Sequence, residues 1–291
     1  MRAPLAILVV ASLALAGCLT NSAPAPLDGA DPASLAPSAA PGLPAGVPAA
    51  FNTTGCEDHV GWLPLPMAMA QVPEGFSPVP FDPAGTLATV VFIGARCEAT
   101  AGVGLAGEAM HAAFSGLAVD PPAELARADA GFQILLYGLV TDRDDLAAAF
   151  GAWGVDASKA DAISLDTSDA GAARVGRYHS SAGGEVFDLA TVIGQVATDG
   201  AGTSRWFSAR DGKVVGMFDL DWNENNFGQG EAVLAWTGAM PGPPLAGVGI
   251  HSWGEAYGYE VRDVPLPEAS TPAPSAAAAW PGFLRALPGS N

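Results

Sequence analysis

The sequence predicts an α+β fold rich in β-structure: a mostly antiparallel curved sheet, or a β-barrel or cone, with one main amphipathic helix. The chain contains 36 glycines and 25 prolines, and 14% of its residues are charged, a composition typical of turn-rich β proteins. Apolar runs of strand length recur along its central part, separated by turn residues. A single segment has apolar residues at helical spacing.

Nine segments are expected to form strands because they are rich in β-branched, aromatic and aliphatic residues. The segment 86–97 should be a central strand, and Asp211-Gly212 predicts a tight hairpin between two of the later ones. The nine segments are 86–97, 110–119, 131–140, 174–179, 186–196, 203–210, 213–222, 231–236 and 248–253.

The one predicted helix follows the strand 131–140. Thr141 is expected to cap its N-terminus, and Gly154 should end it. Its first turn is acidic, which suits the positive end of the helix dipole: Asp142, Asp144 and Asp145. Four apolar residues at helical spacing should face the core: Leu146, Ala149, Phe150 and Trp153.

The N-terminus has the features of an exported chain. Arg2 precedes an apolar stretch, 3–16, that is too short to span a bilayer, which predicts a signal peptide over 1–17. The sequence Leu15-Ala16-Gly17-Cys18 resembles the lipobox of prokaryotic lipoproteins, which implies that Cys18 is lipidated. The alternative is an ordinary signal peptide that ends near a cysteine. The lipobox implies a protein held by its lipid at the extracytoplasmic face of the membrane.

Composition divides the rest of the chain. Residues 18–54 form an Ala/Pro/Ser-rich tether with no periodic apolar face, 55–263 is expected to be one β-rich globular domain, and 264–291 is a Pro/Ala-rich tail.

The chain is strongly acidic, with 30 Asp and Glu against 12 Lys and Arg and a formal charge of −18. Such a surface repels nucleic acid and anionic lipid head groups, so neither is an expected partner. Only Lys159 and Lys213 are lysines. An acidic surface poor in lysine is typical of proteins from high-salt environments, and a halophilic or marine archaeon or a high-GC bacterium is the expected source.

Two cysteines remain after Cys18. In an oxidising compartment Cys56 and Cys97 should form a disulfide, which would close a loop of about 40 residues and contribute roughly 3–4 kcal/mol. Free thiols or two metal ligands are the alternatives. Asn52-Thr53-Thr54 is an N-glycosylation acceptor pattern at Asn52.

Signals for metals and cofactors are weak. Asp219, Asp221 and Asn223 place oxygen atoms at alternate positions, as at the start of a calcium loop, but Glu224 stands where the loop needs glycine. A cation site of another kind and a solvated strand end are both open. The four histidines show no metal-binding spacing and are expected to be structural or surface residues: His59, His111, His179 and His251. Residues 102–107 match a dinucleotide-binding pattern at the wrong distance from the preceding strand, and no cofactor is expected.

One family resemblance covers residues 63–240. Leu63-Pro64 and 72–76 (VPEGF) resemble the entry to the barrel of the acetoacetate decarboxylase-like fold, a β-cone with few helices. The helix and 154–159 (GVDASK) resemble that family's helix followed by G-x-P-K-K. The resemblance implies that Lys159 forms a Schiff base with a ketone and that Glu108 is the neighbouring acid. This chain lacks the proline and the second lysine that lowers the pKa of the first.

Three functions therefore stay open. A lipid-anchored binding domain for a small apolar ligand is expected from the export signal and the aromatic strand residues (Trp206, Phe207, Phe218, Trp222, Trp236, Trp253), and this domain is expected not to be an enzyme. The alternatives are a decarboxylase-like lyase that uses Lys159 and a structural lipoprotein of the cell envelope.

Overall fold

The computed structural model describes residues 49–102, 105, 107–194, 200–224, 226–237 and 243–262. The predictions for the signal peptide, Cys18, most of the tether and the C-terminal tail lie outside these residues. Within them, we find no helix with the length and apolar character needed to cross a bilayer.

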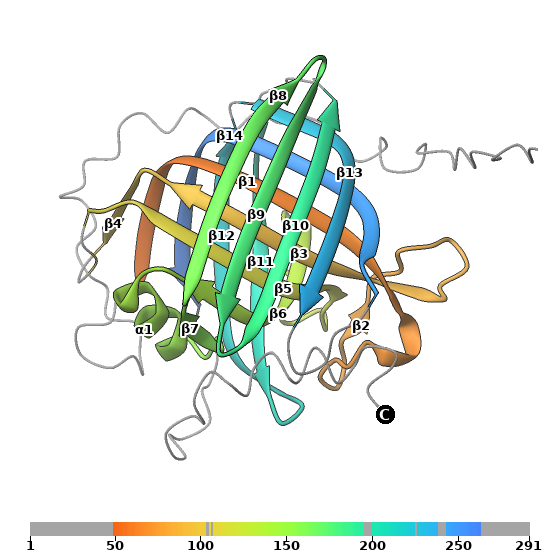
Figure 1. Ribbon diagram of the computed structural model, residues 1–291. Coiled ribbons are helices and arrows are strands. Elements are labelled where there is room, and N and C mark those ends of the chain that lie inside the picture. Colours follow the sequence, from red (N-terminus) through yellow and green to blue (C-terminus); the bar gives the residue numbers. More distant parts are fainter. Residues whose placement is uncertain are drawn as a thin grey trace, which may run out of the picture. The chain divides into compact units, whose positions relative to one another are not determined.

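The described part of the chain is a large curved sheet with a single α-helix, α1 (Asp144–Ala152), and one short 3₁₀ turn, η2 (Met67–Met69) (Figure 1). The strands of the first half are β1 (Ala50–Pro66), β2 (Ser77–Pro78), β3 (Leu87–Cys97), β4 (Ala99–Gly102), β5 (Met110–Asp120), β6 (Phe132–Thr141) and β7 (Ala157–Lys159). Those of the second half are β8 (Ala162–Ala170), β9 (Ala173–Ala182), β10 (Glu185–Gly194), β11 (Gly200–Arg210), β12 (Lys213–Glu224), β13 (Asn226–Thr237) and β14 (Leu245–Val261).

The strand pairing closes part of the sheet on itself. The order β1-β3-β5-β6-β11-β12-β14 returns to β1, because β14 also pairs with β1. Nearly all pairs are antiparallel, and β6 pairs in parallel with β7 and β11. The first half of β14 pairs with β13, from which β10, β9 and β8 continue. These four strands form a layer that crosses in front of β1, β3 and β5 in Figure 1. The sheet is therefore curved and mixed, but it is not a simple barrel.

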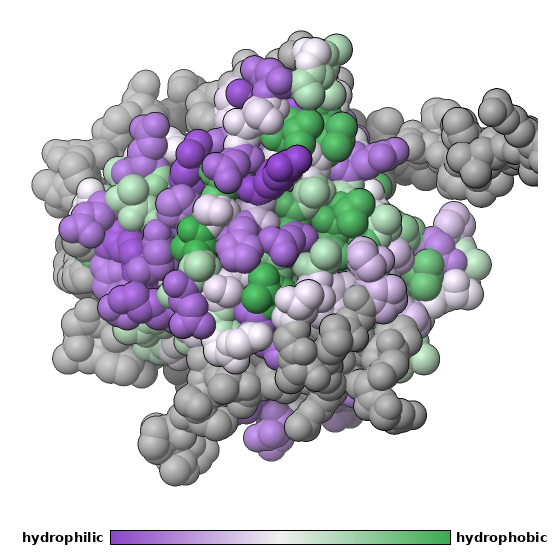
Figure 2. All heavy atoms as spheres, viewed as in Figure 1, coloured by the Kyte–Doolittle hydropathy of each residue, from purple (hydrophilic) through white to green (hydrophobic). Residues whose placement is uncertain are grey.

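Because strand residues alternate between faces, this topology creates two cores. The ring core lies on one face of β1 and β3 and includes Phe51, Val91, Phe114 and Trp206. The interlayer core lies on the opposite face, where Leu63, Phe92, Tyr178 and Phe187 are buried between the ring strands and the β8–β10 layer. Figure 2 shows the outside of that layer, where hydrophilic and hydrophobic side chains alternate in patches.

The helix α1 covers the ring core. All four of its expected core residues are buried: Leu146, Ala149, Phe150 and Trp153. Gly154 follows with a φ of +84°, which glycine adopts without strain, so its predicted role as the helix end is confirmed. The predicted cap is wrong, since Arg143 is the N-cap residue and Thr141 belongs to β6. The Thr141 hydroxyl instead donates to the His111 carbonyl at 2.7 Å.

The predicted fold class is confirmed, and each of the nine predicted segments overlaps a strand. Asp211 and Gly212 have φ angles of 52° and 73°, as a tight hairpin requires. Two long strands were missed. The boundary predicted at residue 54 falls inside β1, which begins at Ala50, and no strand was predicted over β8, which contains the polar run Ser164 to Asp169.

Candidate functional site

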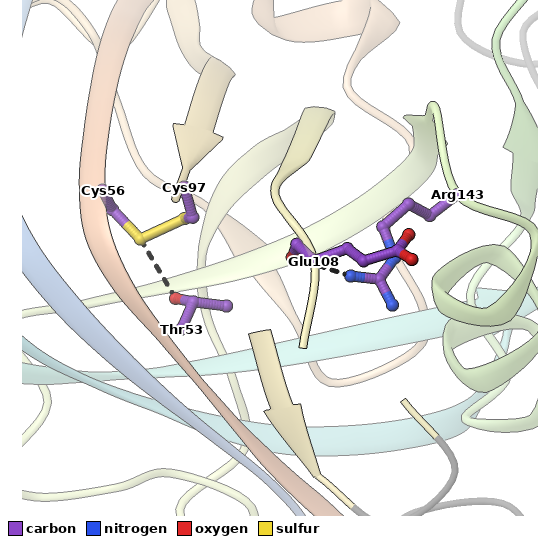
Figure 3. Close-up of a disulfide and its surroundings, with 5 residues drawn as sticks. All are labelled: Thr53, Cys56, Cys97, Glu108 and Arg143. Atoms are coloured by element: carbon purple, nitrogen blue, oxygen red, sulfur yellow. Dashed lines mark hydrogen bonds between the residues drawn. A yellow bond between two sulfur atoms is a disulfide. The ribbon is translucent and has the colours of Figure 1, made fainter. Parts of the chain in front are cut away.

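The disulfide between Cys56 and Cys97 is present and joins β1 to the end of β3 (Figure 3). Both cysteines are buried, and the Thr53 hydroxyl lies 3.1 Å from the Cys56 sulfur. The expected pairing is therefore confirmed. Asn52 is exposed on β1, and its modification stays a prediction.

The two residues that the decarboxylase resemblance singled out lie on the surface. The Lys159 side chain is 55% exposed, and its Nζ donates to the Asp144 carboxylate at 2.6 Å. Glu108 is exposed before β5, and its carbonyl accepts a hydrogen bond from Arg143 at 2.9 Å (Figure 3). Neither side chain is placed in a core, and no contact between the two is found among the described residues.

The expected cation ligands have a different arrangement. Asp219 is buried, and its carboxylate accepts hydrogen bonds from Arg205 at 2.7 and 3.0 Å and from Arg262 at 2.7 Å. Arg127 lies 3.3 Å from the same carboxylate and 3.2 Å from that of Asp221. Burial alone would raise the pKa of Asp219, but these guanidinium groups hold it below its ordinary value.

Three arginines already neutralise Asp219, so a metal cation there would face their repulsion. The expected cation site at Asp219, Asp221 and Asn223 is therefore corrected. Asp219 and Asp221 belong instead to an arginine–aspartate cluster. The segment is also strand rather than loop, because β12 extends to Glu224. The side chain of Asn223 lies outside the described ones.

A different polar cluster lies at the edge of the interlayer core, formed by Glu57 and His59 on β1 and His251 on β14. Strand pairing places His59 directly opposite His251. The two imidazole rings are stacked, with centroids 4.1 Å apart and planes 11° apart. His251 Nε2 lies 2.9 Å from Glu57 Oε1. One ligand atom from each of the three side chains lies within 4.8 Å of the others.

Threonine hydroxyls from the opposite layer complete the surroundings of His59. Its Nδ1 lies 2.6 Å from the Thr191 hydroxyl and its Nε2 lies 3.1 Å from that of Thr167. Thr167 also hydrogen-bonds Glu57, so this hydroxyl lies between the His59 ring and the carboxylate. His251 is bound on one side only: its Nδ1 is buried and has no hydrogen-bond partner among the described residues.

The neighbouring strand leaves room for the His59 ring because residue 176 is glycine. A Cβ atom at Gly176 would lie 1.9 Å from His59 Cε1, closer than any side chain could tolerate. On the other side, Trp253 stacks on His251 at 4.7 Å, and the Arg174 guanidinium lies 4.5 Å from the Trp253 ring centroid. The cluster is thus a built interior feature with packed walls, not a chance meeting of surface groups.

The electrostatics give the two residues on β1 distinct protonation states. Burial favours the neutral form of Glu57, but hydrogen bonds from His251 and Thr167 and the charges of His251 and Arg96 lower its pKa to about 2. Burial, reinforced by the charge of His251, lowers the pKa of His59 to about 3. At neutral pH, Glu57 is therefore a carboxylate and His59 is a neutral imidazole whose two nitrogens contact threonine hydroxyls.

His59 and His251, which were predicted to be structural or surface residues, are both buried, but the sequence did not indicate that they lie together. The missed signal is the pattern Glu57-x-His59, because residues two apart on a strand share a face. The partner His251 is 192 residues further on, and no local pattern could supply it. The aromatic residues expected to line a ligand site mostly pack the two cores, since Trp206, Phe207, Phe218 and Trp236 are buried.

Comparison with known proteins supports the fold class. No model of a known protein family matches the chain, and no curated protein matches it. Among solved structures, the chain is similar to an enzyme of the acetoacetate decarboxylase-like fold. That enzyme is the enduracididine biosynthesis enzyme MppR with HEPES buffer bound, with a TM-score of 0.51, 11% identity, and coverage of 74% of this chain and 86% of that chain. The structure of MppR complexed with pyruvate has a TM-score of 0.48 and 12% identity, over 74% of this chain and 88% of that one. At this identity the likeness shows the fold alone.

Proposed function

We propose that this chain is a lipoprotein anchored at the extracytoplasmic face of the membrane, whose β-rich domain binds a ligand and does not carry out Schiff-base catalysis. The export signal and the sequence around Cys18 support the anchor. About 30 residues separate Cys18 from β1, the first strand that the structure describes.

The positions of the two lysines support the proposal that the domain does not carry out Schiff-base catalysis. A Schiff base needs an unprotonated amine in a site that excludes water. Lys159 is exposed and ion-paired with Asp144, and Lys213 is exposed in the hairpin between β11 and β12. A lyase built on Lys159 would therefore have an accessible, charged amine.

Borohydride trapping tests this point. Incubation of the full-length protein with acetoacetate and borohydride should leave its mass unchanged, with Lys159→Ala as the matched control. A stable adduct that disappears in Lys159→Ala would overturn the non-catalytic assignment.

The anchor is tested separately by Cys18→Ser. The variant should be released from the membrane as a folded protein, because the proposed lipid is the sole attachment and the acidic surface does not favour anionic membranes. Retention of Cys18→Ser on the membrane after a high-salt wash would show another anchor and contradict the proposal.

A further inference from the structure

We propose that Glu57, His59 and His251 bind one divalent transition-metal ion, with zinc as the expected occupant. This names the ligand class for the binding domain and so rests on the proposed function, although it does not depend on the lipid anchor. Two imidazole nitrogens and one carboxylate oxygen form a ligand set that zinc uses in proteins, with a fourth position left for water or another ligand.

The geometry brings the three donors close to coordination distance. Zinc bonds nitrogen and oxygen at about 2.0–2.2 Å, so ligand atoms around one ion lie roughly 3–3.5 Å apart. The contact between His251 Nε2 and Glu57 Oε1 is 2.9 Å, and all three donors lie within 4.8 Å of one another. The rings of His59 and His251 are stacked nearly parallel, so the rings have to rotate apart before both lone pairs point to one ion.

A metal ion can displace the groups that now form hydrogen bonds with the three ligand atoms. His251 Nε2 and Glu57 Oε1 lie 2.9 Å apart, and a metal ion bound to both would replace the hydrogen bond between them. His59 Nε2 has the longer of the ring's two contacts, 3.1 Å to Thr167, while the 2.6 Å contact of Nδ1 with Thr191 can hold the ring in place. A metal-binding histidine usually has such a partner on its other nitrogen, because that partner fixes the ring orientation.

An independent observation is that Nδ1 of His251 is left without a hydrogen bond by the residues that the structure describes. The His251 side chain is fully buried, and a buried polar atom left unpaired is destabilising. An ion or another ligand at this ring would therefore meet a nitrogen that no described residue occupies.

The chain offers matched controls for the test. His111 pairs with Asp142 at 2.8 Å, and His179 pairs with Asp188 at 2.8 Å, but both histidines are partly exposed and neither belongs to a group of three metal-ligating residues among those described. Each control removes one histidine from a histidine–carboxylate pair and leaves the cluster untouched.

The experiment uses untagged full-length protein in detergent, stripped of metal with EDTA and titrated with zinc. We expect one zinc per chain. His59→Gln and His251→Gln should weaken binding at least 100-fold and Glu57→Gln at least 10-fold, whereas His111→Gln and His179→Gln should change it less than twofold. No binding at one zinc per chain, or equal losses in the control variants, would overturn the proposal.

A measurement on the unmodified protein covers the case in which a buried histidine variant does not fold. Pulsed electron paramagnetic resonance of the copper-loaded protein should detect two imidazole ligands, and a spectrum with fewer would contradict the site. A protein that binds no metal but retains a copurified small molecule would overturn the metal site and leave the proposed binding function intact. A protein that binds one zinc per chain and also forms a borohydride adduct would support the metal site and overturn the non-catalytic assignment.

Discussion

Two buried polar clusters among the described residues are built on different principles. At Asp219 the carboxylate is surrounded by three guanidinium groups, and its hydrogen-bonding capacity is used by Arg205 and Arg262. At the Glu57–His59–His251 cluster, one ring nitrogen of His251 has no partner among the described residues, and the donors converge. The Asp219 cluster is therefore suited to hold strands together, while the histidine cluster retains capacity to bind something else.

The largest effect on stability is expected from Asp219→Asn. It would leave three arginines facing a neutral amide, and breaking a buried ion pair by removing one partner costs about 3 kcal/mol or more. Urea unfolding measures this loss. The neighbouring Asp221→Asn is the control, because Asp221 is 58% exposed and should cost less than about 1 kcal/mol. Equal losses for the two variants would show that burial of the cluster does not matter.

A smaller loss is expected from Gly176→Ala, which tests the packing of the histidine cluster. The new methyl group would displace the His59 ring and cost about 2 kcal/mol, as overpacking of a buried site usually does. Zinc affinity should fall with it. Gly151→Ala is the control, since a Cβ there meets nothing within 4 Å and lies in α1, where alanine is favoured by up to about 1 kcal/mol. Unchanged stability and zinc binding in Gly176→Ala would contradict the observed packing.

The two clusters should also respond to acid in different ranges. The pKa of His59 is about 3 in the folded protein against 6.5 ordinarily, so the unfolded chain takes up a proton first as pH falls. Its effect is a loss of stability from about pH 6.5 down to about pH 3, at up to about 1.4 kcal/mol for each pH unit. The pKa of Glu57 is lowered from 4.5 to about 2, which adds a further loss between those values.

Asp219, whose pKa is lowered from 3.8, loses its stabilising charge only below about pH 3.8. Unfolding measured at pH 7 and pH 5 should therefore show a decrease in the wild type and in Asp219→Asn, and a smaller one in His59→Gln. An equal decrease in all three proteins would exclude His59 as its source.

The smallest effect is expected from His179→Gln. The pair of His179 with Asp188 is exposed on both sides, so its loss should change the free energy of unfolding by less than about 0.5 kcal/mol. A loss above 1 kcal/mol in thermal or urea unfolding would show that exposed histidine–carboxylate pairs in this protein matter more than their solvation suggests.

The sequence was sufficient to predict the elements whose buried apolar residues form a local pattern along the chain. The strand 86–97 and the helix with Leu146, Phe150 and Trp153 have local apolar patterns, and the structure confirms both. The strand β8 has no such pattern, because its polar residues, Thr167 among them, face the histidine cluster or solvent. The same reason hid the site: polar residues on paired strands become informative only when the pairing of β1 with β14 is known.

The Cys56–Cys97 bond bears on how the histidine cluster is held in place. Cys56 directly precedes Glu57, and Cys97 directly follows Arg96, while Glu57 and Arg96 form an ion pair with each other across β1 and β3. The covalent link therefore restrains the two strand ends that carry one side of the cluster. Reduction of the disulfide would remove this covalent restraint and leave Glu57 held by its strand pairing and its ion pair with Arg96.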